Sequence, residues 1–592
     1  MALLGIFSLA QIWFLPGYLV LRLLRGIHPI DKVLLAIPLS AVLNFFLVYI
    51  LVLLDCYTQP VIISFFLIEL LVLIYIKQII KAPKKYSSQL VANNINIQVN
   101  FTNIMFGILA LICFAQFISQ IGTVFTQGDA VMSWNNWAIS WFNGKIPNGL
   151  AWYPQLLPTL YSLTYQFIED SRIELFAKIS ISIYPMVVLA LFLRAAILLP
   201  FEKNRILWSG IVFFILVRRL WGSESTLNGY ADFPLTLFCT SILYVFILAA
   251  NQRNERHSQL SITYPAILIS LTIGAGLMKQ SGVYLGLLVP FVWLFYFREN
   301  CNWSKHIYKS ILIGLVIAAG YSTWYLYQYY RIATGIEQSN LKQLASIVSL
   351  PWYESIVYGF NGITKKLSWL WVALFISSIL NKNIRYLSLF VVSPFLLLWA
   401  AFVPYDYRNL AAVFPFFSIS LVYGWVKLLD LFKSILPIFK MGPEILQKVT
   451  IFLVLTVMTI ALSNPKYKNE LLEISLSAKK QIGDPEINNL LITYFAIHPE
   501  PSLLATPYVE VSKIPGLSDR FSYFTCLVNT PNSNKPSMKS VISELNNPKI
   551  QHILLLPWCD ASIKNYFSDQ PEKYTIIFRH KGTVLYKVSN TH

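Results

Sequence analysis

The chain has 592 residues, of which 56% are hydrophobic and 12% charged, with a mean hydropathy of +0.58. Soluble domains carry about 25% charged residues, so this composition excludes an ordinary soluble enzyme, a disordered tail and a coiled coil. Lys and Arg number 46 against 28 Asp and Glu, which leaves a formal net charge of +18. In a soluble protein such an excess suggests a nucleic-acid partner, but here the cations must first be placed relative to a membrane.

Apolar segments dominate the first three quarters of the chain. About 20 mainly apolar residues cross a bilayer core, and on that basis we expect fourteen spans. They lie near residues 2–21, 32–54, 58–77, 101–121, 173–193, 205–220, 230–250, 262–278, 281–297, 309–330, 367–381, 385–403, 409–427 and 448–464. The first segment has no small-residue cleavage site after it, so we expect a retained helix and not a signal peptide. The predicted fold class is mainly α, a polytopic transmembrane bundle.

Cations concentrate in every second connection between these segments. About twenty-one Lys and Arg fall in seven such loops, and the cytoplasmic loops of membrane proteins carry this kind of excess. The alternate connections, 122–172, 331–366 and everything after Ser463, are longer and less basic. We therefore expect a multi-pass protein of the plasma (bacterial inner) membrane with both termini outside the cytoplasm. Most of the positive charge is then a topology signal, and no nucleic-acid partner is expected.

After residue 464 the sequence becomes polar, with short β-rich runs such as Ile553–Leu556. This length and pattern predict a small extracytoplasmic α/β domain. Its cysteines, Cys526 and Cys559, either pair in an oxidising compartment or remain two buried thiols. The predicted division of the chain is an N-terminal three-helix membrane extension (1–100), a transmembrane catalytic module with outer loop 122–172 (101–464), and the α/β domain (465–592).

The large outer loop predicts an amphipathic helix from Asp129 to Gly144. Polar residues recur at i, i+4, i+7, i+11 and i+14 from Asp129, and Trp134, Trp137 and Trp141 form a second stripe. We expect this helix to lie along the outer interface, where indole rings favour the headgroup zone. Asp129 could be a helix N-cap or a general base acting on a lipid-borne substrate. The tryptophans could be anchors or part of a groove.

The residues that follow carry a family resemblance. Gly144-Lys145-Ile146-Pro147 leads into Tyr153-Pro154-Gln155-Leu156-Leu157-Pro158. An acidic residue after a membrane helix, an amphipathic stretch ending in Gly, and a Pro-rich turn into the next helix resemble the GT-C superfamily of membrane glycosyltransferases. That superfamily uses polyprenyl-phosphate sugars and includes protein O-mannosyltransferases and aminoarabinose transferases. Asp129 stands alone where the family often has two adjacent acids.

Three later segments resemble the same superfamily, and the resemblance covers roughly residues 101–430. The first is the Tyr-acid opening of a helix, the second a Lys turn between two short helices, and the third an Arg-Tyr…Pro segment. In this chain they are Asn228–Leu235 with Tyr230 and Asp232, Gly276–Gly282 with Lys279, and Asp406–Pro415 with Arg408.

The resemblance implies an inverting glycosyltransferase that moves a hexosyl or pentosyl group from a polyprenyl-phosphate donor to an acceptor hydroxyl at the outer face. Asp129 would be the catalytic base. Cations at the outer ends of spans are expected to stabilise the lipid phosphate; they are Arg408, Lys279, Arg218 and Arg219, the last two of which could instead snorkel. Asp232 could pair with one of them, position the acceptor or cap its helix. The expected sugar and lipid groove consists of Trp134, Asn136, Trp137, Tyr153, Gln155, Tyr230 and Asp232.

No cofactor is assigned with certainty. The sequence has no His and Cys spacing typical of a zinc site and no nucleotide-binding Gly loop. A divalent metal stays open, because other acids on the outer side could converge. The acceptor could be a protein, a lipid or a glycan. Two alternatives to the transferase are a polysaccharide polymerase or ligase acting on lipid-diphosphate glycans, and a transporter or flippase.

Overall fold

A computed structural model gives the structure of the chain. It describes residues 1–24, 26–79, 101–125, 129–148, 152–221, 229–256, 263–296, 303–336, 351–404, 406–435, 485–498, 503–507, 521–524, 538–548, 550–557 and 559–589. By their contacts, residues 1–123 and 137–478 form one compact unit, and residues 124–136 and 479–592 form another. We call them the membrane unit and the C-terminal unit.

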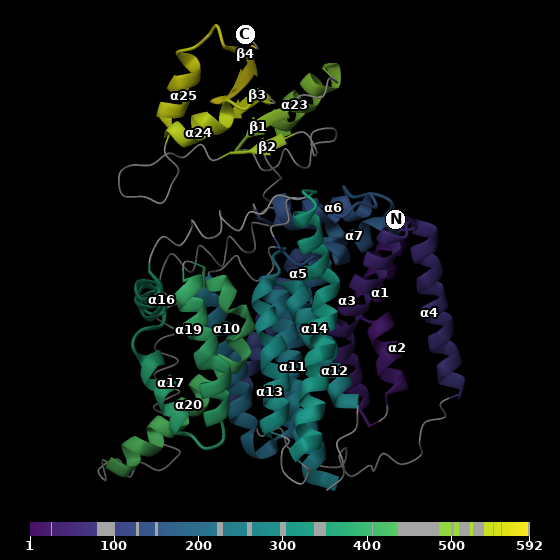
Figure 1. Ribbon diagram of the computed structural model, residues 1–592, viewed down its shortest axis with the longest axis vertical. Helices are drawn as coiled ribbons and strands as arrows, with labels where there is room; N and C mark the ends of the chain where they lie inside the picture. The colour runs from purple at the N-terminus through teal and green to yellow at the C-terminus, as the bar shows by residue number, and fades with distance from the viewer. Residues whose placement is uncertain are drawn as a thin grey trace. The chain divides into compact units, whose positions relative to one another are not determined.

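The membrane unit is a bundle of roughly parallel and antiparallel helices (Figure 1). The helices before residue 222 are α1 (Ala2–Trp13), α2 (Leu15–Leu23), α3 (Pro29–Leu53), α4 (Gln59–Ile79), α5 (Phe101–Gln120), α6 (Asn136–Phe142), α7 (Leu156–Ile168), α8 (Leu175–Ser182), α9 (Tyr184–Leu198), η3 (Pro200–Glu202) and α10 (Lys203–Trp221). The later ones are α11 (Asp232–Arg256), α12 (Thr263–Met278), η4 (Gln280–Val283), α13 (Tyr284–Tyr296), α14 (Trp303–Ala333), α16 (Trp352–Leu367), α17 (Leu370–Leu380), α18 (Arg385–Leu387), η5 (Ser388–Val392), α19 (Ser393–Phe402), η6 (Tyr407–Ala412) and α20 (Phe414–Ile435).

In the described residues, eight helices are long and apolar enough to cross a membrane, or nine if the bent pair α16 and α17 is one span. The predicted fourteen is therefore not reached by this criterion. The described part of the chain has a helix at each of the other predicted positions, but those helices are shorter or less apolar, and segment 448–464 lies outside the described residues. The mainly α, polytopic fold is confirmed.

Buried or part-buried acids connect the helices at one end of the bundle through ion pairs and hydrogen bonds. Asp31 is buried, and its Oδ1 accepts hydrogen bonds from Arg194 Nε and Tyr244 Oη, both at 2.7 Å. Glu202 likewise accepts from Arg205 Nη1 at 2.7 Å and from Tyr423 Oη at 2.8 Å. Each acid therefore joins helices that are far apart in sequence. We call this the Asp31 end.

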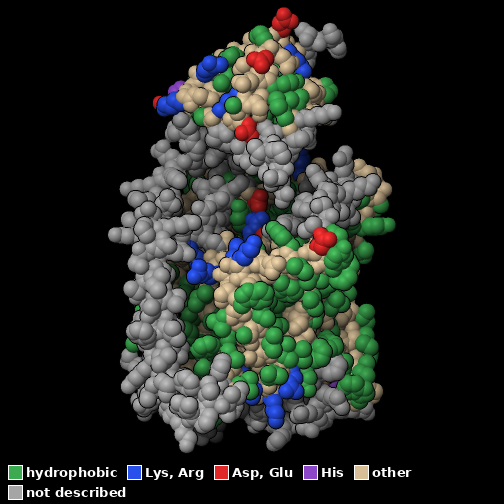
Figure 2. Space-filling model, turned by 90° about the vertical axis from the view of Figure 1, so that its left-hand side faces the viewer, with side chains coloured by type: hydrophobic (Ala, Val, Ile, Leu, Met, Phe, Trp, Pro, Cys, Tyr) green, Lys and Arg blue, Asp and Glu red, His purple; other side chains and the backbone are tan. Residues whose placement is uncertain are grey.

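Helix α10 begins at the Asp31 end and runs to the opposite end of the bundle. Its 19 residues span about 28 Å, which is close to the thickness of a bilayer core. On the face drawn in Figure 2, hydrophobic side chains cover the middle of the membrane unit, and Lys and Arg gather at both ends. We call the end where α10 finishes the Arg408 end.

The N-terminal helices pack into the same unit as the rest of the bundle. Tyr49 Oη of α3 donates to the carbonyl of Thr323 in α14 at 3.1 Å, and Trp13 Nε1 of α1 donates to the carbonyl of Ser180 in α8 at 2.6 Å. By contacts, helices α1 to α4 belong to the same unit as the helices that follow them. The division of the chain near residue 100 stays a prediction.

Two local predictions are corrected. The expected continuous helix 129–144 begins as a π-helical turn, η2 (Ala130–Asn135), before α6. A π turn departs from the 3.6-residue period on which the predicted continuous helix was based. In addition, the connection 331–366, expected to be a loop, contains helix α16.

The C-terminal unit confirms the predicted small α/β domain. Its five-stranded sheet has the order β2-β1-β3-β5-β4. Strands β2, β1 and β3 are parallel to one another, and β5 is antiparallel to both of its neighbours, β3 and β4. The strands are β1 (Leu503–Thr506), β2 (Phe521–Tyr523), β3 (Ile550–Leu555), β4 (Tyr574–His580) and β5 (Thr583–Val588), and the helices are α23 (Pro485–Ile497), α24 (Met538–Leu545) and α25 (Ala561–Ser568). Burial lowers the pKa of His552 in the central strand β3 to about 4, so this side chain is neutral at pH 7.

Cys559 takes part in a disulfide bond. Cys56, Cys113 and Cys239 are free, so its partner lies outside the described residues. Cys526, the predicted partner, is among the residues that are not described.

Candidate functional site

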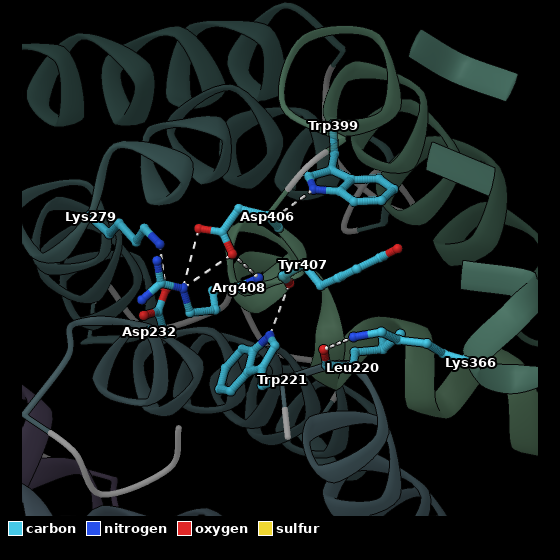
Figure 3. Close-up of polar contacts among 9 residues, drawn as sticks. All are labelled: Leu220, Trp221, Asp232, Lys279, Lys366, Trp399, Asp406, Tyr407 and Arg408. Carbon is cyan, nitrogen blue, oxygen red and sulfur yellow. Dashed lines mark hydrogen bonds and ion pairs between the residues drawn. The ribbon is translucent and has the colours of Figure 1, made fainter. Parts of the chain in front are cut away.

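Three segments singled out in the sequence meet at the Arg408 end. Asp232 opens helix α11, Lys279 lies between α12 and η4, and Arg408 lies in η6. Figure 3 shows the three side chains converging, with the Arg408 guanidinium directed towards Asp232 and Lys279. Segments separated by as many as 176 positions in the chain (232 to 408) therefore supply one polar cluster. The family resemblance predicts the order of these motifs along the chain, but it does not predict the contacts among their side chains.

Asp232 and Lys279 form a buried ion pair. Lys279 Nζ donates to Asp232 Oδ1, and the two side chains are only 9% (Lys279) and 5% (Asp232) exposed. Asp232 also lies in the first turn of α11, where the helix dipole stabilises a carboxylate. Of the three roles left open for Asp232, pairing with a cation is the one that the printed contacts show.

The backbone around Lys279 requires close packing. Lys279 is extended (φ −155°, ψ 149°) in the break between α12 and η4. At Gly282 in the following turn, a Cβ atom would lie 2.1 Å from the carbonyl oxygen of Ala275. Because only glycine permits this approach, the turn fixes where Lys279 leaves the helix.

Arg408 is held on several sides. Its backbone N and its Nε both donate to Asp406 Oδ1, at 2.9 and 3.1 Å. The guanidinium carbon lies 5.0 Å from the centroid of the Tyr230 ring, a cation–π contact. Trp399 Nε1 donates to the carbonyl oxygen of Asp406 at 3.0 Å, which anchors the turn itself. The Nε edge of Arg408 is therefore occupied, and 32% of the side chain is exposed, so Arg408 presents a guanidinium of fixed orientation at this end of the bundle.

Tyr407 and Lys366 extend the cluster on the other side of η6 (Figure 3). Lys366 Nζ lies 4.2 Å from the centroid of the Tyr407 ring and donates to the carbonyl of Leu220 at 2.7 Å. Trp221 Nε1 donates to the carbonyl of Tyr407 at 2.9 Å. Burial raises the pKa of the Tyr407 hydroxyl, with Tyr358 contributing, so it remains protonated.

Lys366 is the residue of this cluster that the sequence analysis missed. It was placed in an outer loop, whereas it ends helix α16 and reaches the last turn of α10. The available signal in the sequence was the pair Lys365-Lys366 directly before the predicted span 367–381. In the structure the chain bends by 104° between α16 and α17 just after this pair.

The predicted base, Asp129, lies in the segment that groups with the C-terminal unit, as do Trp134 and Asn136. Asp129 is exposed and precedes η2, and its side chain makes no capping hydrogen bond there. The simple N-cap interpretation is therefore not supported. The catalytic role of Asp129 and the groove roles of Trp134 and Asn136 stay predictions.

The remaining residues of the predicted groove differ in how much of each side chain is exposed to a ligand. The rings of Trp137 and Tyr153 lie 5.8 Å apart and are both part-exposed. Gln155 is fully buried, and its Oε1 accepts from Trp141 Nε1 at 3.1 Å. Trp141 is also fully buried and so is not an interfacial anchor. Internal packing therefore occupies the Gln155 side chain, which leaves it no exposed surface for a sugar or lipid.

Arg218 and Arg219 lie in the last turn of α10, where cations stabilise the negative end of the helix dipole. Arg219 is exposed and Arg218 half-buried. This position explains both residues without a ligand, and their contact with a lipid phosphate stays a prediction.

No group of three or more His, Cys, Asp or Glu side chains in the described part of the chain is arranged to hold an ion. Asp232 and Asp406, the acids nearest Arg408 in Figure 3, are each engaged by a cation, so they do not form an open ligand set.

Several solved structures are similar to this chain at low sequence identity. ArnT from Cupriavidus metallidurans, solved bound to undecaprenyl phosphate, is 13% identical over 83% of this chain and 98% of that chain, with a TM-score of 0.48. The archaeal oligosaccharyltransferase AglB from Archaeoglobus fulgidus, solved with an inhibitory peptide and a dolichol-phosphate, is 13% identical over 83% of this chain and 74% of that chain, with a TM-score of 0.43. No protein-family model and no curated protein matches the chain. A likeness at this level carries no functional argument, so the function rests on the residues themselves.

Proposed function

We propose that this integral membrane protein is an inverting glycosyltransferase that takes a sugar from a polyprenyl phosphate and transfers it to an acceptor hydroxyl at the Arg408 end. The observation that carries the proposal is the convergence of three separate sequence motifs on one polar cluster, formed by Asp232, Lys279 and Arg408. A departing lipid phosphate gains negative charge as its bond to the sugar breaks, and fixed cations stabilise that charge.

The proposed reaction is a single displacement. The acceptor oxygen forms a bond to the anomeric carbon from the face opposite the phosphate, and the bond from that carbon to the phosphate oxygen breaks. The electron pair leaves with the phosphate, and the acceptor proton goes to a general base. Arg408 would bind the phosphate through its guanidinium group. Asp129 is the proposed base, on the sequence pattern.

The proposed orientation places the Arg408 end outside the cytoplasm. The cation-rich connections predicted to be cytoplasmic include those at the Asp31 end, between α9 and α10 and before α3. The disulfide bond of Cys559 supports an oxidising location for the C-terminal unit.

A deletion strain of the source organism provides the test, because the unused donor should accumulate. Mass spectrometry of its lipids should reveal a sugar on a polyprenyl monophosphate, and purified protein in proteoliposomes should transfer that sugar. Complementation with Arg408→Ala should fail, whereas Arg172→Ala, an exposed arginine in a similar turn, should complement. Accumulation of a diphosphate-linked glycan would favour a polymerase or ligase, and uptake of labelled lipid without covalent transfer would favour a flippase; either result would overturn the proposal.

A further inference from the structure

The charges of the cluster are almost balanced. Figure 3 contains two carboxylates, Asp232 and Asp406, and three cations, Lys279, Arg408 and Lys366. Each carboxylate binds one cation, and Lys366 contacts a backbone carbonyl and an aromatic ring. A site evolved only for tight binding of an anionic phosphate would gain affinity by leaving such cations unpaired.

The position of Asp232 is unfavourable for an anionic ligand, because its carboxylate lies against one of the cations proposed to bind the phosphate. Its carboxylate occupies one donor position of the buried Lys279 ammonium. A phosphate oxygen that accepts a second proton of the same ammonium would lie about 4–5 Å from the carboxylate, given ordinary hydrogen-bond lengths and tetrahedral geometry. At that separation in a site shielded from water, two negative groups repel one another strongly.

We propose that Asp232 competes with the lipid phosphate for Lys279 and thereby promotes release of the polyprenyl-phosphate product. This inference rests on the proposed function and assigns Asp232 as a positioning residue that sets phosphate affinity. The carboxylate orients the Lys279 ammonium while no lipid is bound. Once the bond to the sugar has broken, the same carboxylate weakens the hold of the cluster on the more highly charged product.

The test is direct binding of a long-chain polyprenyl monophosphate to the full-length protein in detergent, followed by native mass spectrometry or calorimetry. Asp232→Asn removes the charge with little change in shape, and we expect it to bind the lipid about tenfold tighter or more. In a transfer assay the same variant should show stronger inhibition by added polyprenyl phosphate and a lower turnover number. Asp170→Asn, in an exposed turn, is the matched control and should leave both values unchanged.

Asp232→Asn leaves Lys279 without its carboxylate, so a second variant guards against a folding defect. Asp232→Asn/Lys279→Gln removes both charges, a replacement that buried ion pairs often tolerate, and it should bind the lipid more weakly than Asp232→Asn. Unchanged or weaker binding by folded Asp232→Asn would overturn the inference. Absence of lipid binding by the unaltered protein would instead overturn the proposed function, so the two failures are distinguishable.

Discussion

The chain contains two Asp-x-Arg turns that share two local hydrogen bonds. In the turn between α7 and α8, Arg172 N and Nε both donate to Asp170 Oδ1 at 2.9 Å. In η6, Arg408 N and Nε donate to Asp406 Oδ1 at 2.9 and 3.1 Å. In the first turn, Arg172 Nη2 also donates to Asp170 Oδ2 at 2.7 Å. The local sequence therefore builds a similar arginine-holding turn twice.

The surroundings of the two turns differ. The Arg172 side chain is 72% exposed, whereas Arg408 is 32% exposed and lies over the Tyr230 ring. Trp399 anchors the carbonyl of Asp406. An ion pair at an exposed turn contributes little because water screens it. The comparison shows that tertiary contacts, and not the turn itself, make Arg408 a candidate for phosphate binding.

The largest expected effect separates the two arginines. Arg408→Ala should lower the rate of sugar transfer in proteoliposomes by roughly 10²–10³-fold, the usual loss when a group that stabilises developing charge is removed. Arg172→Ala should stay within about twofold. Arg408→Lys should recover only part of the rate, because lysine lacks the planar fork. Equal losses in Arg408→Ala and Arg172→Ala, at equal amounts of folded protein, would show that the surroundings do not matter.

The second prediction concerns the two acids. Asp406→Ala should lower the turnover number by roughly 10–100-fold, the range seen when a partner that orients a ligand-binding group is lost. Asp406→Asn keeps an acceptor oxygen and should lose less. Asp170→Ala should have no effect on transfer. A normal rate in Asp406→Ala would mean that Arg408 does not depend on this turn for its orientation.

The third prediction tests the packing behind η6. In Gly362→Ala the new Cβ would lie 2.1 Å from Tyr407 Oη, and in Gly314→Ala the nearest side-chain atom would be 3.5 Å away. Overpacking of this kind costs about 1–3 kcal/mol, so Gly362→Ala should lower the thermal stability in detergent and Gly314→Ala should not. Adding Tyr407→Phe should restore much of the stability. No recovery in the double variant would place the strain elsewhere.

The smallest effect is a titration at the exposed turn. Hydrogen bonding to Arg172 lowers the pKa of the Asp170 carboxyl below its ordinary value of 3.8. A carboxyl with a depressed pKa in the folded state stabilises the fold above its ordinary pKa, and this contribution disappears as the pH falls through the lowered value. Arg172→Gln should raise the pKa of Asp170, as measured by NMR on labelled aspartate. An unchanged titration would show that the turn is open in solution.

The sequence alone determined the fold class, because apolar segments long enough to cross a bilayer leave few other solutions. It also located the small α/β domain and the three motif segments containing Asp232, Lys279 and Arg408. It did not separate full spans from shorter helices, since length and hydropathy vary continuously. The π turn before α6 was missed because one extra residue per turn leaves no clear mark on the polar pattern.

Only the tertiary structure decided which charges act together. Asp31 and Asp232 both lie close to helix N-termini, yet Asp31 binds Arg194 and Tyr244, whereas Asp232 pairs with Lys279 in the cluster that contains Arg408. Lys366 joined the cluster through the fold of α16 against α10, and Gln155 was removed from the proposed groove by burial. The physical reason is that burial and electrostatic partners depend on contacts between helices distant in sequence, and the spacing of residues along one helix does not contain them.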